Sequence, residues 1–317
     1  MEKSDNLNLL RFIIKEDSEN IKRCITRSSF DFNDFNDFIS SGKLAGYLYT
    51  VLQTFPSRDL FPVDLVNNFK LSYLRQWSNN EKLLREIVAL RSLFADSGRE
   101  VIFLKGPFLA QHFYGNIDRR SIGDIDVLVK SAENLEAWDF LLLKEGFRRQ
   151  SIILFSKKLT CYFTHHFEYK KNGIILELHW ALQRHFSINI NYTKLWEQKR
   201  EFILKDNIFY VLSDEYTLVV FLNTVFIDIQ TGKFAFKTFL DIYMILKAID
   251  KDIKWEEFFA SREAEGLFLI CLNALNLALG FLDCYDEFRE LSLFIEKNKK
   301  FLRCRGLSGV LDRSRLA

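Results

Sequence analysis

Two aspartates that could hold a metal ion stand one residue apart in the segment RRSIGDIDVLVK, residues 119–130. Asp124 and Asp126 flank Ile125 at the head of an apolar run that is typical of a buried strand. Alternate residues of a strand point to the same face, so the two carboxylates should project side by side. Such a pair repels itself unless a divalent cation neutralises it. Mg²⁺, which prefers oxygen ligands and leaves positions for phosphate oxygens, is the ion that this pair favours.

A structural role for the same two aspartates stays open at this point. Asp124 could cap a turn, and Asp126 could form an ion pair with Arg119 or Arg120. Under the metal-binding hypothesis, changing either aspartate to asparagine should relieve the repulsion and remove a ligand. The fold should then persist while the activity is lost.

A third carboxylate lies in the segment GIILELHW, residues 173–180. Its alternation places Glu177 and His179 on one strand face and a stripe of core residues on the other. If this strand lies beside the strand of Asp124, Glu177 could ligate a second metal or accept the proton of an attacking hydroxyl. His179 could orient Glu177 or contact a substrate. The structural alternative is that Glu177 is an exposed strand residue.

A helix that is predicted to begin at Pro107 could bind an anion, because free backbone N–H groups and a positive dipole end lie at a helix N-terminus. Gly106 would let a phosphate approach the backbone closely. Lys105 and Arg120 would neutralise phosphate charge, Arg120 through a bidentate contact. The sequence contains no Walker loop here, so the L-K-G turn by itself is a weak indication.

Three motifs occur in a fixed order: Leu104-Lys105-Gly106, an arginine four positions before Asp124-Ile125-Asp126, and Glu177-Leu178-His179-Trp180. Together they resemble the uncharacterised nucleotidyltransferase family of the DNA-polymerase-β-like superfamily. The later segment FKTFLDIYMIL, with Lys237 four positions before Asp241, is similar to that family's helical region. The resemblance covers roughly residues 75–282.

The resemblance implies nucleotidyl transfer from an NTP, with ATP as the expected donor and Mg²⁺, or alternatively Mn²⁺, as the metal. It implies Asp124 and Asp126 as metal ligands and Glu177 as a third ligand or base. The residues that it places at the nucleotide are Lys105, Gly106, Arg120, Gly123, His179, Lys237 and Asp241. A degenerate nucleotidyltransferase that binds nucleotide or a partner without turnover is the alternative.

The order of helix and strand patterns along the chain predicts an α+β fold. A small mixed β-sheet, which the resemblance identifies as a nucleotidyltransferase core, is expected to be flanked by N-terminal and C-terminal helical regions. Hydrophobic spacing of three and four residues predicts helices over residues 1–98, and the α/β core is expected at 99–182. A second helical region is expected at 183–305, and residues 306–317 are expected to be a disordered tail.

Turn and cap residues divide the core further. Ser131 and Gly146 are predicted to bound a helix, and a hairpin should turn at KKNG, residues 170–173. Ser213 is predicted to cap the first helix of the C-terminal region. His165 and His166, just before the first hairpin strand, could reach an acceptor pocket or serve as hydrogen-bonding residues where the strand starts.

Composition limits the partners. The chain of 317 residues has a net charge of +2 with both signs interspersed, which argues against a long nucleic acid and leaves a small molecule, a peptide or a protein as acceptor. Five dispersed cysteines without a C-x-x-C motif favour core thiols and a cytoplasmic location. The apolar stretches are too short for a membrane span. The oligomeric state stays open.

Overall fold

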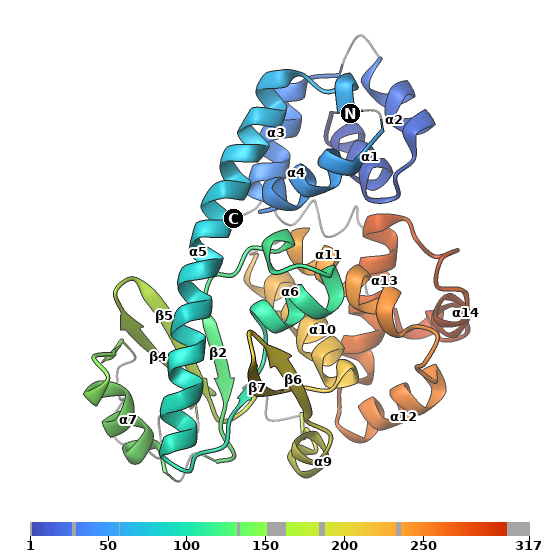
Figure 1. Ribbon diagram of the computed structural model, residues 1–317. Helices are drawn as coiled ribbons and strands as arrows, with labels where there is room; N and C mark the ends of the chain where they lie inside the picture. Colours follow the sequence, from blue (N-terminus) through green and yellow to red (C-terminus); the bar gives the residue numbers. More distant parts are fainter. Residues whose placement is uncertain are drawn as a thin grey trace.

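The computed structural model (Figure 1) is a mixed α/β protein in which helical segments flank one sheet. It describes residues 2–26, 30–56, 58–131, 134–150, 163–183, 188–232 and 236–302. The N-terminal helices are α1 (Glu2–Ile14), α2 (Ser18–Ile25), α3 (Phe32–Ser41), α4 (Ala45–Thr54) and α5 (Val63–Asp96). The C-terminal helices are α9 (Tyr192–Glu197), α10 (Asp214–Thr231), α11 (Phe236–Ile249), α12 (Trp255–Ala264), α13 (Phe268–Leu282) and α14 (Arg289–Lys297). The predicted fold class is confirmed.

The sheet combines strands from two parts of the chain. In spatial order it contains β3 (Arg148–Arg149), β4 (His166–Lys171), β5 (Ile174–His179), β2 (Ile125–Leu128), β1 (Ile102–Phe103), β7 (Asn207–Val211) and β6 (Arg200–Leu204). The pairs β2–β5 and β1–β7 are parallel, and the other four neighbouring pairs are antiparallel. Helices α6 (Pro107–Tyr114) and α7 (Leu135–Lys144) connect strands within this core.

The long helix α5 joins two hydrophobic cores. It has 34 residues, which corresponds to a length of about 51 Å. Its first turns contribute Phe69 to the core of the helical regions, while Leu84 and Phe94 lie in the core beneath the sheet. Phe94 meets Trp138 of α7 edge to face, with ring centroids 5.3 Å apart. Helix α5 therefore ties the sheet to the N-terminal helices, as Figure 1 shows.

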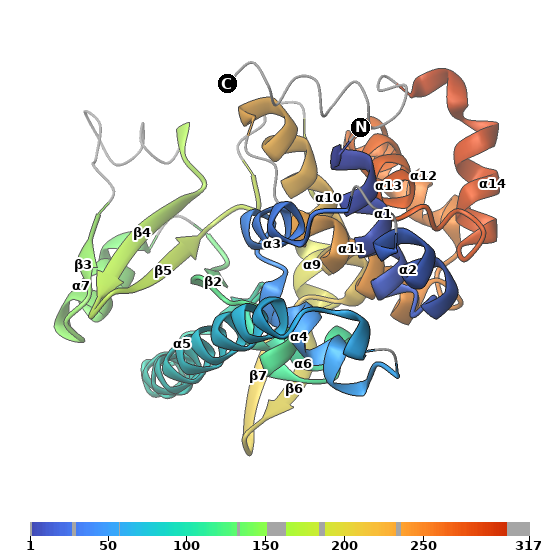
Figure 2. The same cartoon turned by 90° about the horizontal axis from the view of Figure 1, so that it is seen from above.

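The N-terminal and C-terminal helical regions pack against each other. Arg11 of α1 donates hydrogen bonds to the backbone carbonyls of Gly280 and Phe281 at the end of α13. Figure 2 shows α1 beside α13. The cysteines among the described residues, Cys24, Cys271 and Cys284, are buried thiols, as a packing role predicts. None of the helices in the described ranges combines the length and the apolar character that crossing a membrane requires.

Most of the predicted elements of the core are present. The hairpin turns at Asn172 and Gly173, whose φ values of 51° and 79° suit a two-residue turn. Gly146 follows α7 at φ 85°, and Ser213 caps α10 by accepting a hydrogen bond from the Tyr216 backbone. Ser131, however, does not cap α7, because that helix begins only at Leu135.

The region expected to be helical from residue 183 onward contains two strands before its long helices. Strands β6 and β7 form a hairpin within it and extend the sheet beyond β1. The hairpin turns at Lys205 and Asp206, both at positive φ, and this residue pair lacks the Asn-Gly signature of such turns. The sheet therefore does not end at residue 182, where the core was expected to end.

Candidate active site

Strand register brings the predicted acidic residues together. Strands β2 and β5 are parallel neighbours, and Asp126 lies directly opposite Glu177. Side chains of opposed residues share a sheet face, so the two carboxylates lie on one surface. Residues of the opposite face, such as Val127 and Leu178, are fully buried in the core beneath the sheet. The burial of that apolar face is what holds the polar face in register.

Asp126 is the most enclosed of the three predicted metal ligands, with 4% of its surface exposed. Its Oδ1 lies 3.6 Å from Lys105 Nζ and 3.3 Å from His179 Nε2. Burial alone would raise the pKa of Asp126, but the Lys105 charge and the His179 hydrogen bond outweigh burial and hold the pKa below its ordinary value. Asp126 is therefore an ionised carboxylate with its own counter-charges.

Asp124 lies one residue before β2 and is half-buried. Burial and the charge of Asp126 raise its pKa above the ordinary value. Among the described residues, the group around Asp126 whose donor atoms lie within 4.8 Å of one another consists of Asp126, Glu177 and His179, and it does not include Asp124. The predicted three-carboxylate cluster is thus present as two carboxylates and an imidazole, with Asp124 at its margin.

His179 links the two carboxylates. It is 6% exposed, and its Nε2 lies 3.1 Å from Glu177 Oε2 as well as 3.3 Å from Asp126 Oδ1. Burial lowers its pKa, but the hydrogen bonds to Asp126 and Glu177 outweigh this effect and raise the pKa above the ordinary value of histidine. The structure thus places His179 where it can orient Glu177, as its strand face predicted.

Arg120 and Asp241 form a buried ion pair. Nε and Nη2 of Arg120 donate to the two carboxylate oxygens of Asp241 at 2.6 and 2.9 Å, and the Tyr114 hydroxyl donates to Asp241 at 2.6 Å. Arg120 is 6% exposed and Asp241 is fully buried. The Nε–Nη2 edge of the guanidinium is thus occupied by Asp241 rather than free for a phosphate, and the pair links the loop before β2 to α11. Binding of the triphosphate by Arg120 and Asp241 stays a prediction.

Lys237 lies beside this pair and donates from Nζ to the Ser121 carbonyl at 3.0 Å. Burial, and then the nearby charge of Arg120, lower the pKa of Lys237 to about 7. Lys105, in contrast, is held charged, because Asp126 raises its pKa above the ordinary value. Two lysines therefore flank the carboxylates in different electrostatic environments.

Lys237 predicts a pH dependence of stability. Between about pH 7 and the ordinary lysine pKa of 10.5, the unfolded chain binds a proton that the folded chain lacks, so the free energy of unfolding should rise with pH. Lys237→Met should remove this part of the rise. Urea denaturation of both proteins at pH 7, 8 and 9 measures it. A difference in stability between the two proteins that stays constant over this range would contradict the prediction.

Two asparagines of α5 position the loop that leads into β2. Asn80, which is fully buried, donates to the carbonyls of Ile117 and Arg120 at 3.0 and 2.8 Å, and its Oδ1 accepts from the Ile122 backbone at 3.0 Å. Asn79 donates to the Ile122 carbonyl at 2.7 Å. Sequence reasoning missed this role, although two adjacent amides within an amphipathic helix were a visible signal.

Asn80→Ala should leave three buried backbone groups without partners. Each such group costs about 1–3 kcal/mol, so we expect the free energy of unfolding to fall by about 2–4 kcal/mol after partial rehydration. Asn79→Ala, at an exposed position of the same helix, is the matched control and should cost less. Urea denaturation compares the two variants, and equal losses would show that Asn80 has no special role.

The two glycines predicted at the nucleotide, Gly106 and Gly123, differ in whether the backbone conformation demands a glycine. Gly106 has φ 81° and ψ −135°, a conformation that strains any other residue, and it stands immediately before α6. Gly123 is exposed, and a Cβ atom there would meet nothing within 4 Å. Gly106 is therefore needed for the backbone turn itself, whereas the space beside Gly123 is open to a ligand.

Two further residues lie on the same sheet face, His166, which the sequence had indicated, and Glu168, which it had not. In the hairpin, His166 lies opposite His179 and Glu168 lies opposite Glu177. The two-residue turn at Asn172-Gly173 sets this register, so counting outward from it would have found Glu168 as well. Asp126, Glu177 and Glu168 thus form a row across three neighbouring strands.

The residues present fit a divalent cation. Oδ2 of Asp126 is buried and, in the part of the chain that the structure describes, has no hydrogen-bond partner. Such an orphaned oxygen is costly unless something else binds it. Donor atoms of Asp126, Glu177 and His179 lie within 4.8 Å of one another, and carboxylate oxygens are the ligands of Mg²⁺ and Mn²⁺.

The fold is a mixed sheet between helical regions, and the family model that matches most of the chain makes the protein a transferase of the nucleotidyltransferase class. The chain belongs to the family described as uncharacterised nucleotidyltransferases, whose sequence model matches residues 28–283. The predicted family is confirmed. Membership implies an NTP donor and, as a rule, a divalent metal.

Two solved structures resemble part of the chain. The solution structure of the antibiotic-resistance factor ANT(2″)-Ia aligns with a TM-score of 0.40 and 12% identity, over 60% of this chain and 91% of that chain. The crystal structure of ANT(2″)-Ia with adenylyl-2″-tobramycin aligns with a TM-score of 0.38 and 12% identity, over 58% of this chain and 94% of that chain. Among curated proteins, none matches the sequence.

Proposed function

We propose that this protein transfers a nucleoside monophosphate from an NTP to a hydroxyl or phosphate of a small-molecule, peptide or protein acceptor, and that Mg²⁺ is the metal. One observation carries the proposal: Asp126 and Glu177 are register partners on parallel strands, and a buried oxygen of Asp126 lacks a hydrogen-bond partner among the described residues. ATP is the first donor to test.

The position of each residue suggests which part of the substrate or metal it would bind. Asp126 and Asp124 would hold the metal, which would neutralise charge on the phosphates when bound. Lys105, 3.6 Å from Asp126, would approach the phosphates at the N-terminus of α6, where Gly106 exposes the backbone. Lys237 would contact the same anion from α11.

Glu177 is proposed as the general base. It lies opposite Asp126, and its side chain is 24% exposed, which leaves it accessible to an acceptor. The acceptor oxygen would attack the α-phosphorus as its proton passes to Glu177. The bond from the α-phosphorus to the bridging oxygen would break, and pyrophosphate would leave. Holding the reactants in line and screening charge would supply most of the rate enhancement.

The experiment that tests the proposal compares thermal stability and pyrophosphate release across the four NTPs, each with and without Mg²⁺. The wild type should be stabilised by one NTP only when Mg²⁺ is present, and the Asp124→Asn/Asp126→Asn protein should show no such effect. Stabilisation without pyrophosphate release in the presence of candidate acceptors would favour the non-catalytic binding module. A wild type that no NTP stabilises would refute the proposed donor site.

A further inference from the structure

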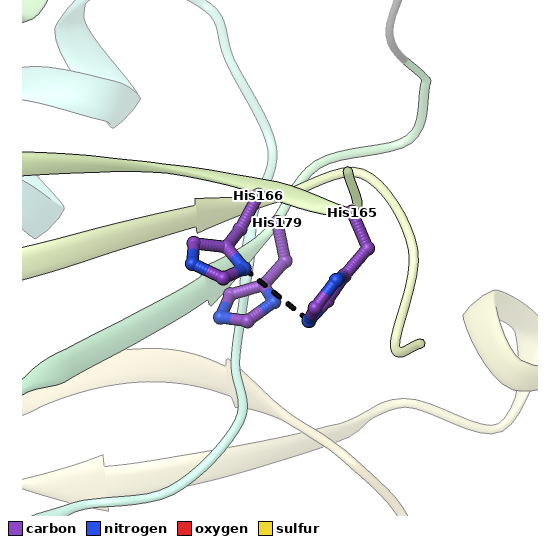
Figure 3. Close-up of side chains that lie close together, drawn as sticks. All are labelled: His165, His166 and His179. Atoms are coloured by element: carbon purple, nitrogen blue, oxygen red, sulfur yellow. Dashed lines mark hydrogen bonds between the residues drawn. The ribbon is translucent and has the colours of Figure 1, made fainter. Parts of the chain in front are cut away.

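Three histidines converge beside the carboxylates. Figure 3 shows the rings of His165, His166 and His179 facing one another from the start of β4 and the end of β5. One ring nitrogen of each lies within 4.8 Å of the others, and His166 Nδ1 is 3.2 Å from His165 Nε2. The ring centroids are 4.5 to 5.6 Å apart. The chain has five histidines, so three of them are gathered at this one place.

The backbone holds this cluster in place. His166 and His179 are register partners of the antiparallel pair β4–β5. The carbonyl of His165 accepts a hydrogen bond from the Trp180 backbone at 3.0 Å, which ties the residue before β4 to the end of β5. The three side chains therefore project from paired strands rather than from a free loop, and such sites lose little entropy when they bind an ion.

The nitrogens of His179 have different partners. Nε2 faces the carboxylates of Asp126 and Glu177, whereas Nδ1 is buried and, among the residues that the structure describes, has no hydrogen-bond partner. Histidines that ligate metals ordinarily donate their other N–H to a carboxylate, which orients the ring and strengthens the ligand. His179 is arranged in this way, and Nδ1 is the ring nitrogen that remains for a metal ion.

We propose that His165, His166 and His179 form a second cation site, selective for a borderline transition metal such as Zn²⁺ and separate from the carboxylate oxygens that suit Mg²⁺. Imidazole ligands favour zinc, copper or nickel, while Mg²⁺ prefers oxygen. With Zn–N bonds of about 2.0–2.1 Å, two ligands of a tetrahedral ion lie about 3.3 Å apart, close to the 3.2 Å between His165 and His166.

The site has three protein ligands, so a fourth position is open to water or to an acceptor atom, as in zinc sites that bind substrate. It shares His179 with the carboxylate cluster but uses the other ring nitrogen. Zn²⁺ bound there would fix the ring that hydrogen-bonds Asp126 and Glu177, and would thereby position both carboxylates. His165 and His166 thus acquire a specific role beside the proposed transfer site.

The test is a Zn²⁺ titration of untagged protein by calorimetry, with saturating Mg²⁺ throughout so that the oxygen ligands are occupied. One equivalent of Zn²⁺ should bind to the wild type, and X-ray absorption at the zinc edge should show a nitrogen and oxygen shell containing three imidazoles. His165→Ala and His166→Ala should each weaken binding at least about 100-fold, beyond the roughly 10–100-fold loss typical of an outer-shell partner.

His112→Ala is the matched control, because His112 pairs with Asp214 at 3.1 Å, away from the cluster, and its loss should leave Zn²⁺ affinity unchanged. Equal Zn²⁺ affinity in His166→Ala and wild type, or sulfur in the zinc shell, would overturn the proposal. The readout is independent of nucleotide transfer. Zn²⁺ binding that persists when no NTP stabilises the protein would support this site while refuting the transfer function.

Discussion

Asp126→Asn should remove the Mg²⁺-dependent part of NTP affinity and lower pyrophosphate release by about 10³-fold. The loss of one preorganised electrostatic contact to a transition state typically costs about 10²–10³-fold, and a metal ligand should stand at the upper end of that range. Calorimetric titration of ATP with and without Mg²⁺ measures the first effect even before the acceptor is known.

Glu168→Gln is the matched control for this variant. Glu168 lies on the same sheet face, directly opposite Glu177, yet it does not belong to the group of donor atoms around Asp126. Its loss should leave the Mg²⁺ dependence of ATP binding intact. If Asp126→Asn retained that dependence, or if Glu168→Gln lost it equally, Asp126 would not be the metal ligand.

The two aspartates should differ in their effect on stability. Sequence reasoning expected neutralisation of either one to relieve repulsion, but Asp126 lies 3.6 Å from Lys105 and 3.3 Å from His179. Asp126→Asn should therefore weaken the fold, because it leaves buried donors without their charged partner. Only at Asp124, whose pKa is raised by burial and by Asp126, does relief of repulsion remain the expected result.

Asp241→Asn should destabilise the protein by about 3–5 kcal/mol, the usual cost of leaving a buried charge without its partner. Arg120 would remain 6% exposed without its anionic partner, because asparagine offers one neutral carbonyl oxygen in place of two carboxylate oxygens. The pair joins residues 121 positions apart, so its loss should also loosen the loop that leads to Asp124. Urea denaturation and the Mg²⁺ dependence of ATP binding measure the two effects.

The double variant Arg120→Met/Asp241→Leu separates positioning from phosphate binding. Replacing both partners of a buried pair by apolar residues is often neutral or stabilising, so most of the stability should return. If Arg120 acts only through its pairing with Asp241, ATP affinity should return with it. A stable double variant with ATP affinity more than about tenfold weaker, or 1.4 kcal/mol, would instead indicate that Arg120 contacts the triphosphate.

The sequence by itself determined the local features of the site. Strand alternation put Asp124 and Asp126 on one face, and Glu177 and His179 on another strand's polar face, because side chains of a strand alternate with period two. The Asn172-Gly173 turn defined the hairpin. It also fixed which residues of the second strand lie opposite His166 and Glu168. These features depend only on neighbouring residues, so they could be predicted.

The tertiary structure alone decided which strands and helices meet. Nothing local requires β2 to pair with β5 so that Asp126 faces Glu177, or β7 to join β1 so that Val211 pairs with Phe103. The Arg120–Asp241 pair and the Asn80 bonds to the loop before β2 likewise join distant segments. These contacts form because distant segments pack together when the two hydrophobic cores are buried. The free energy of that packing depends on the whole chain, so no single segment of the sequence predicts it.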